Sequence, residues 1–172
     1  MAIVSRTHGR PPRHPIHDPR LGGWYFITIV TEGRQWMFGR VAGDQLLLTT
    51  AGCIVEQEWR RTEEIRYEVT LGPWVVMPDH FHGLIQIEGM DQTALPEESD
   101  VSALHRPPHS IGSVIGTFKA ACTGRINQLH GTPGRRIWQT NYWDRIVRDQ
   151  RMWDTFARYI HDNPVKLLGS RR

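Results

Sequence analysis

Two histidines separated by one residue have the clearest capacity for metal chemistry in this sequence. His80 and His82 lie in an apolar stretch, residues 74–87, whose composition is typical of a β-strand. Side chains alternate between the two faces of a strand, so both imidazoles should project to one side and could hold one divalent metal ion. The opposite face would be apolar and suited to a core, with Phe81, Ile85 and Ile87. This spacing alone is weak evidence, because two histidines can also be ordinary polar residues of a strand.

A tyrosine and an asparagine near the C-terminal end form a second candidate pair. Tyr159 and Asn163 are four residues apart in a predicted helix, so they should share a face one turn apart. A free phenol, with a pKa of about 10, is a weak nucleophile at neutral pH and needs assistance from a metal ion or a base. An oxygen-bearing side chain one turn away would suit such assistance. The alternative is that Tyr159 borders the core and Asn163 caps the helix before Pro164.

The elements that must position these residues can be read from hydrophobic periodicity and turn signals. In order they are a strand (24–31), a hairpin (37–49, turning at 42–44), a helix (50–66), two strands (67–76 and 80–87), a helix (110–129), a short strand (145–147) and a last helix (149–163). This order predicts an α+β fold, ferredoxin-like, with an antiparallel sheet and helices on one face.

Local signals set several of these boundaries. Thr49 or Thr50 can cap the first helix. A turn or bulge is expected at residues 77–79, because Pro78 cannot donate a hydrogen bond to a sheet ladder. The last helix should end near Asn163, because Pro164 disfavours helical geometry at the residue before it.

At 172 residues, with 39% hydrophobic and 23% charged residues, the chain should form one soluble domain. We expect this domain at 23–168, after an irregular basic arm (1–22), with an acidic, proline-rich insertion (88–110) and a short basic tail (169–172). Neither a spanning segment nor a signal core is found, which favours a cytoplasmic protein. Cys53 and Cys122 match no metal or redox spacing and should be reduced thiols.

Charge is unevenly distributed along a chain of net charge +3. Residues 111–172 hold eleven Lys/Arg against four Asp/Glu, which fits a polyanion such as nucleic acid but also fits a merely solvated surface. The candidate phosphate contacts are Lys119, Arg125, Arg135, Arg136, Arg145, Arg148 and Arg158. Three aromatic residues could stack on unpaired bases, although core packing is the better explanation for two of the three: Trp138, Tyr142 and Trp143.

Two motifs in the expected order then suggest a family. Pro78-Asp79-His80-Phe81-His82, followed by Tyr159-Ile160-His161-Asp162-Asn163-Pro164-Val165-Lys166, resembles the paired signatures of single-tyrosine HUH transposases. The closer resemblance is to the bacterial REP-associated tyrosine transposases, and it covers residues 24–168. It implies the HUH endonuclease fold and a nuclease and strand transferase acting on single-stranded DNA, often beside a hairpin.

The resemblance also implies roles for individual residues. His80, His82 and Asn163 would bind Mg²⁺ or Mn²⁺, and Tyr159 would attack the scissile phosphate to leave a 5′-phosphotyrosine and a free 3′-OH. The process served would be DNA transposition or REP-like hairpin processing in a bacterial cytoplasm, by a homodimer or a monomer.

Two other functions stay open from the sequence. The first is a non-catalytic DNA-binding protein on the same fold. The second is a 2H-type phosphoesterase, which would need a pair of H-x-T/S motifs, and the sequence does not contain two. Neither a P-loop nor a Rossmann glycine pattern is present, so no nucleotide cofactor is expected.

Overall fold

The computed structural model describes residues 22–89 and 110–169. Its centre is a four-stranded sheet in the order β4-β5-β1-β6, with every neighbouring pair antiparallel. The strands are β1 (Gly22–Val30), β4 (Val69–Val76), β5 (His80–Glu88) and β6 (Trp143–Val147). The first two of these strands along the chain, β1 and β4, flank β5, which is the ferredoxin-like order. The α+β class and the antiparallel sheet are therefore confirmed.

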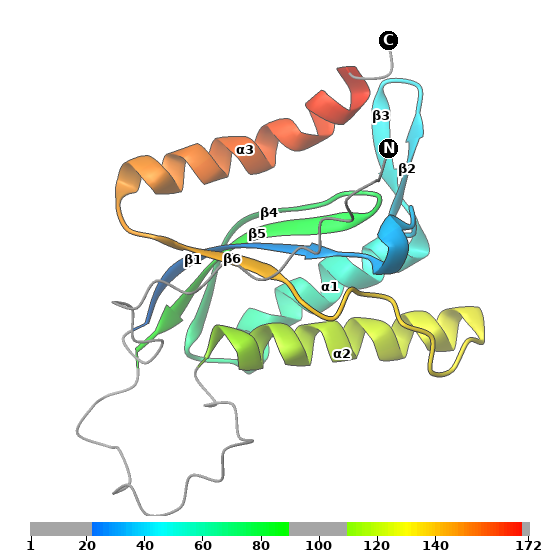
Figure 1. Ribbon diagram of the computed structural model, residues 1–172, viewed down its shortest axis with the longest axis horizontal. Helices are drawn as coiled ribbons and strands as arrows, with labels where there is room; N and C mark the ends of the chain where they lie inside the picture. Colours follow the sequence, from blue (N-terminus) through cyan, green and yellow to red (C-terminus); the bar gives the residue numbers. More distant parts are fainter. Residues whose placement is uncertain (1–21, 90–109, 170–172) are drawn as a thin grey trace, which may run out of the picture.

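Helices cover both faces of this sheet (Figure 1). Two helices, α1 (Thr50–Ile65) and α2 (Ile111–His130), lie on one face, while α3 (Gln150–Gly169) crosses the other. The prediction of helices on one face is thus correct for α1 and α2 and wrong for α3. The reason is visible in β1, where Tyr25 and Phe26 point to opposite faces and are both buried. A strand that is apolar on both sides needs cover on both sides.

Burial divides the interior into a large core and a small one. The large core lies between the sheet and the α1–α2 layer, where the ring of Trp59 lies 4.7 Å from that of Phe81 and 5.1 Å from that of Phe118. The small core lies under α3 and is formed by Phe26, Leu84 and Ile160. The candidate chemistry sits beside this smaller core.

The predicted cap of the first helix and the predicted hairpin are confirmed. Thr49 caps α1 by accepting a hydrogen bond from the Gly52 amide at 3.1 Å, and its hydroxyl donates to the Met37 carbonyl at 2.6 Å. The hairpin is formed by β2 (Gly39–Ala42) and β3 (Gln45–Leu48), and a short 3₁₀ helix, η2 (Glu32–Arg34), precedes it. The expected break after β4 is also present, as the turn that leads into His80.

A close approach between α1 and the hairpin makes Gly52 irreplaceable. A Cβ at this position would overlap the carbonyl oxygen of Phe38, which already accepts from the Thr49 amide. We therefore predict that Gly52→Ala destabilises the fold by about 3 kcal/mol, because backbone must move. Gly124→Ala is the matched control, since a Cβ there meets open space and should stabilise α2 by about 0.5–1 kcal/mol. Urea unfolding of both variants measures the difference; equal stabilities would contradict the packing described.

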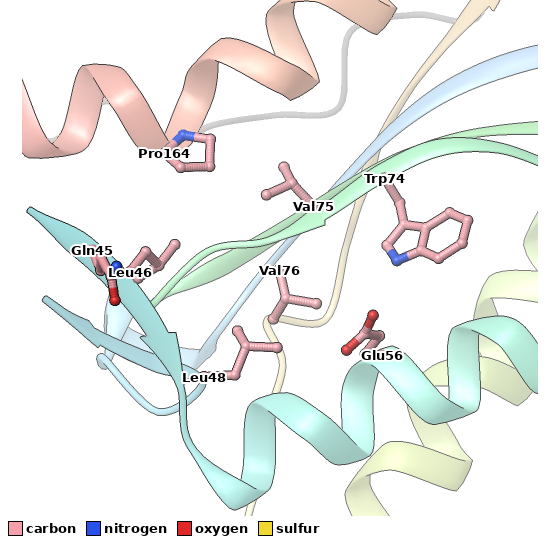
Figure 2. A pocket seen from close by; sticks show the side chains of 8 residues that line it. All are labelled: Gln45, Leu46, Leu48, Glu56, Trp74, Val75, Val76 and Pro164. Carbon is pink, nitrogen blue, oxygen red and sulfur yellow. The ribbon is translucent and has the colours of Figure 1, made fainter.

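The last helix continues past Pro164 to Gly169, so the predicted end near Asn163 is wrong. A proline inside a helix leaves one carbonyl unpaired and costs about 3 kcal/mol. Tertiary contacts offset this cost, because the C-terminal half of α3 reaches β4 and the β2–β3 hairpin. Figure 2 shows Pro164 opposite Leu46 and Val75, across a hollow of about 450 Å³. Among the residues lining this hollow, Glu56 is the charged one, which does not suit a phosphate.

Several sequence predictions fall on residues outside the described ranges. These are the basic arm up to residue 21, the insertion at 90–109 and the tail at 170–172. Cys53 and Cys122 are free thiols, and burial, followed by the Glu58 carboxylate, raises the pKa of Cys122 well above its usual value. Within the described ranges, none of the helices combines the length and apolar character that crossing a membrane requires.

Candidate active site

The two histidines lie side by side on the face of the sheet that α3 covers. Their ring centroids are 4.6 Å apart, and their β1 partners in the register are Val30 for His80 and Thr28 for His82. The strand alternation predicted from the sequence therefore holds, and Phe81 points into the large core on the opposite face.

Each imidazole is held at its Nδ1 atom by a different neighbour. His80 Nδ1 lies 2.5 Å from a carboxylate oxygen of Asp79, and His82 Nδ1 lies 2.8 Å from the Thr28 hydroxyl oxygen. A carboxylate accepts, so the Nδ1 atom of His80 donates to Asp79, and Nε2 is the ring atom that could bind a metal ion. His82 likewise presents the lone pair of its Nε2 atom when its Nδ1 donates to the Thr28 hydroxyl. Histidines that bind metals are commonly oriented in this way through their second nitrogen.

This donor set fits a divalent ion of intermediate hardness. Imidazole nitrogens suit Mn²⁺ better than Mg²⁺, which prefers oxygen ligands. In the part of the chain that the structure describes, no group of three His, Cys, Asp or Glu side chains is arranged for a metal. Further ligands would then be an amide oxygen, water or an oxygen of the substrate.

His82 is held in its neutral form. Burial first, and the neighbouring His80 second, lower the pKa of His82 from 6.5 to about 3, against smaller opposing effects of the Ile27 backbone and Asp79. Neutral imidazole is the form that can donate a lone pair to a metal ion.

The lowered pKa predicts acid sensitivity of the metal-free fold. Between pH 6.5 and 3 the unfolded state binds a proton at His82 that the folded state excludes, so stability falls as pH falls. From pH 7 to pH 5 the free energy of unfolding should fall by about 2 kcal/mol. His82→Gln should remove this part of the pH dependence. Urea unfolding in EDTA at both pH values measures this change. If the wild type and the variant lost the same unfolding free energy between pH 7 and pH 5, His82 would not be the group responsible.

The candidate nucleophile lies against His82. The Tyr159 ring is 5.2 Å from the His82 ring at 72°, and Tyr159 is 40% exposed. Lys166, two turns further along α3, places its ammonium 5.4 Å from the centre of the Tyr159 ring. The structure thus brings Tyr159 and His82 together within one chain, from positions 77 residues apart.

Asn163 lies one turn beyond Tyr159, as the spacing predicts. Its side-chain nitrogen donates to the Tyr159 carbonyl at 3.1 Å, which fixes the amide on α3 and does not use its oxygen.

Sequence reasoning missed two residues that hold this arrangement together. Phe26 stacks on the His82 ring (5.4 Å, 20°) and on Phe156 of α3 (4.3 Å, 5°), and meets the Tyr159 ring edge-on at 5.8 Å. Thr28 orients His82 through its hydroxyl. Thr28 is a polar residue in an otherwise apolar strand, which could have marked it as functional. Its contact with His82 depends on the register between β1 and β5, which the sequence does not give.

Comparison with known proteins shows which proteins the chain is similar to. No family model matches it. An uncharacterised protein of Haemophilus influenzae is 30% identical over 92% of this chain and 89% of that protein. The REP-associated tyrosine transposase of Escherichia coli is 26% identical over 84% of this chain and 68% of its own length. The chain is therefore similar to REP-associated tyrosine transposases over most of its length. A solved structure of such a transposase bound to a REP hairpin shares the fold, with a TM-score of 0.59 and 22% identity over 92% of this chain and 73% of that one.

Within this fold, the candidate phosphate contacts separate into two groups. Three are engaged in the protein itself: Lys119 donates to the carbonyls of Gln139 and Thr140, Arg125 to Glu58 and Gln57, and Arg135 to Gln35. Lys119 and Arg125 also belong to α2, on the face away from the histidines. The other four are exposed and form no ion pair with a carboxylate of the described residues: Arg136, Arg145, Arg148 and Arg158.

The three aromatic candidates separate in the same way. Trp138 is buried at 5% exposure and Tyr142 packs against the large core, as expected for two of the three. Trp143 is 37% exposed and lies edge-on to Phe26 at 5.8 Å. It is therefore the candidate among the three that remains accessible to a base.

Proposed function

We propose that this chain is a metal-dependent endonuclease and strand transferase for single-stranded DNA, with Tyr159 as the nucleophile. The observation that carries the proposal is the contact between the exposed Tyr159 ring and His82 in one chain. Mn²⁺ or Mg²⁺ would be held by His80 and His82, with the Asn163 amide oxygen as the third protein ligand. The role served would be DNA transposition or processing of REP-like hairpins.

The proposed reaction is a transesterification at phosphorus. The phenolic oxygen of Tyr159 forms a bond to the scissile phosphorus and its proton passes to water. The bond to the 3′ oxygen breaks, and this oxygen takes up a proton from water. The products are a 5′-phosphotyrosine and a free 3′-OH, and the reverse attack by a 3′-OH rejoins a strand. A bound divalent ion supplies polarisation of the phosphate and neutralises charge that develops on it.

The residues around Tyr159 contribute orientation and charge to this step. The rings of His82 and Phe26 limit the positions of the phenol. Lys166 adds a positive charge beside a ring that must become anionic to react. Thr28 and Asp79 keep the imidazoles oriented before any metal arrives, which reduces the reorganisation needed for binding.

A substrate beside a hairpin is supported by the related transposase, which was solved with a REP hairpin. A second candidate function is DNA binding without catalysis. It is favoured by one observation, that among the described residues no third His, Cys, Asp or Glu is placed to share a metal ion with His80 and His82.

One experiment separates the two functions. Single-stranded oligonucleotides carrying a REP-type hairpin and randomised flanks are incubated with the protein in Mn²⁺, Mg²⁺ or EDTA, and the products are sequenced. The proposal predicts cleavage at a defined position in metal and none in EDTA. Enrichment of bound strands without cleavage in either metal would support the non-catalytic alternative.

A further inference from the structure

The outer strand β6 carries an exposed aromatic side chain in line with the histidine pair. Thr28 of β1 pairs with His82 on one side and with Trp143 on the other. Directly paired residues point to the same face of a sheet, so Trp143 shares the face of His82. Two strand spacings separate their backbones, which is about 10 Å. A nucleotide attached to a phosphate at the histidines would span such a distance.

The position of the Trp143 indole is fixed by the aromatic cluster beside the site. Trp143 meets Phe26 edge-on at 5.8 Å, and Phe26 stacks on His82. At 37% exposure, part of the indole remains open to solvent. An indole anchored at one edge and open elsewhere can accept a base without first being ordered, which reduces the entropic cost of binding.

Cationic and aromatic groups continue from Trp143 along the same strand. Arg145, opposite Phe26 in the register, shares this face and is exposed. Beyond it, Arg148 lines a hollow of about 420 Å³ together with Trp24, Val147 and Trp153. Asp149 also lines this hollow, but its carboxylate caps α3 by accepting from the Met152 amide at 2.7 Å.

The spacing of these groups suits an extended single strand. Successive residues on one face of a strand are about 6.6 Å apart, close to the separation of neighbouring nucleotides in an extended chain. Alternating aromatic and cationic groups are the usual means of binding unpaired nucleic acid, through base stacking and phosphate attraction.

We propose that the single strand leaves the histidine pair along β6, with the base next to the scissile phosphate stacked on Trp143 and the following phosphate held by Arg145. This inference rests on the proposed function for the identity of its ligand. Trp143 is then a positioning residue for the substrate. The basic residues of α2 lie on the other face of the sheet and are not part of this path (Figure 1).

The test measures binding without chemistry, by fluorescence anisotropy in EDTA. Two labelled probes are compared, an oligonucleotide of about 12 thymidines and an abasic oligonucleotide of the same length, because stacking is tolerant of sequence but needs a base. Trp143→Ala should weaken thymidine binding about tenfold and leave abasic binding unchanged. Trp143→Phe, which keeps an aromatic face, should restore most of the affinity.

Arg145→Gln should behave differently from Trp143→Ala. It should weaken both probes to the same extent and reduce the salt dependence of binding, because it removes a phosphate contact. The matched control is Tyr67→Ala. Tyr67 is 84% exposed and lies next to the start of β4, at the opposite end of the β4–β5 pair from His80. It should change neither probe.

Three results would overturn the inference. They are an equal effect of Trp143→Ala on both probes, no effect on either, or no binding of the thymidine probe by the wild type. Failure of the nuclease proposal is distinguishable from these, because it appears as absent cleavage in metal. A base-dependent effect of Trp143→Ala supports the stacking site whether or not the protein cleaves DNA.

Discussion

Tyr159→Phe should lose strand cleavage by more than about 10⁴-fold, because it removes the atom that attacks phosphorus and leaves everything else in place. The phenylalanine ring keeps the contacts with His82 and Phe26, so the fold and the position of α3 should be unchanged. DNA affinity should change little. Single-turnover cleavage of a hairpin-flanked oligonucleotide in Mn²⁺, together with anisotropy on the same strand, measures both properties.

Tyr67→Phe is the matched control for this change, since it removes the same hydroxyl from a tyrosine next to the start of β4. It should cleave like the wild type. Cleavage by Tyr159→Phe within tenfold of the wild-type rate would remove Tyr159 from the mechanism, whatever the two variants bind.

The second large effect is expected when both histidines are replaced. His80→Gln combined with His82→Gln should abolish saturable Mn²⁺ binding, because both ring nitrogens of the proposed site are lost. Thr28→Val, which keeps the shape but removes the hydroxyl at 2.8 Å from His82, should weaken Mn²⁺ binding about 10- to 100-fold. Thr28→Ser should restore it. Titration of the free ion by electron paramagnetic resonance measures these affinities without relying on activity.

The exposed His130, at the C-terminal end of α2, is the control for non-specific effects of a lost imidazole. His130→Gln should bind Mn²⁺ like the wild type. Undiminished binding by the double histidine variant would show that the metal, if one is used, is held elsewhere.

The sequence was sufficient for features set by local chemistry. Thr49 as a cap and Pro78 at the turn before β5 follow from preferences of single residues. The shared face of His80 and His82 follows from strand alternation. The spacing of Tyr159 and Asn163 likewise placed them one helical turn apart.

Features set by tertiary packing could not be predicted from the sequence in the same way. Continuation of α3 through Pro164 depends on contacts with β4 and the hairpin, which outweigh a local preference. Lys119 and Arg125 carry the charge expected of phosphate contacts, but their partners lie 20 and 67 residues away in the chain. The role of Phe26 depends on strand register and on the path of α3 together.

The most direct measurement of the central claim is the identity of the residue that becomes linked to DNA. The wild type is incubated with a hairpin-flanked single strand in Mn²⁺, digested with trypsin and nuclease, and the nucleotide-bearing peptide is sequenced by mass spectrometry. We predict a phosphodiester on Tyr159 that is absent in EDTA. An adduct on Tyr25, Tyr67 or Tyr142, or cleavage that leaves a free 5′-phosphate with no adduct, would contradict the proposed mechanism.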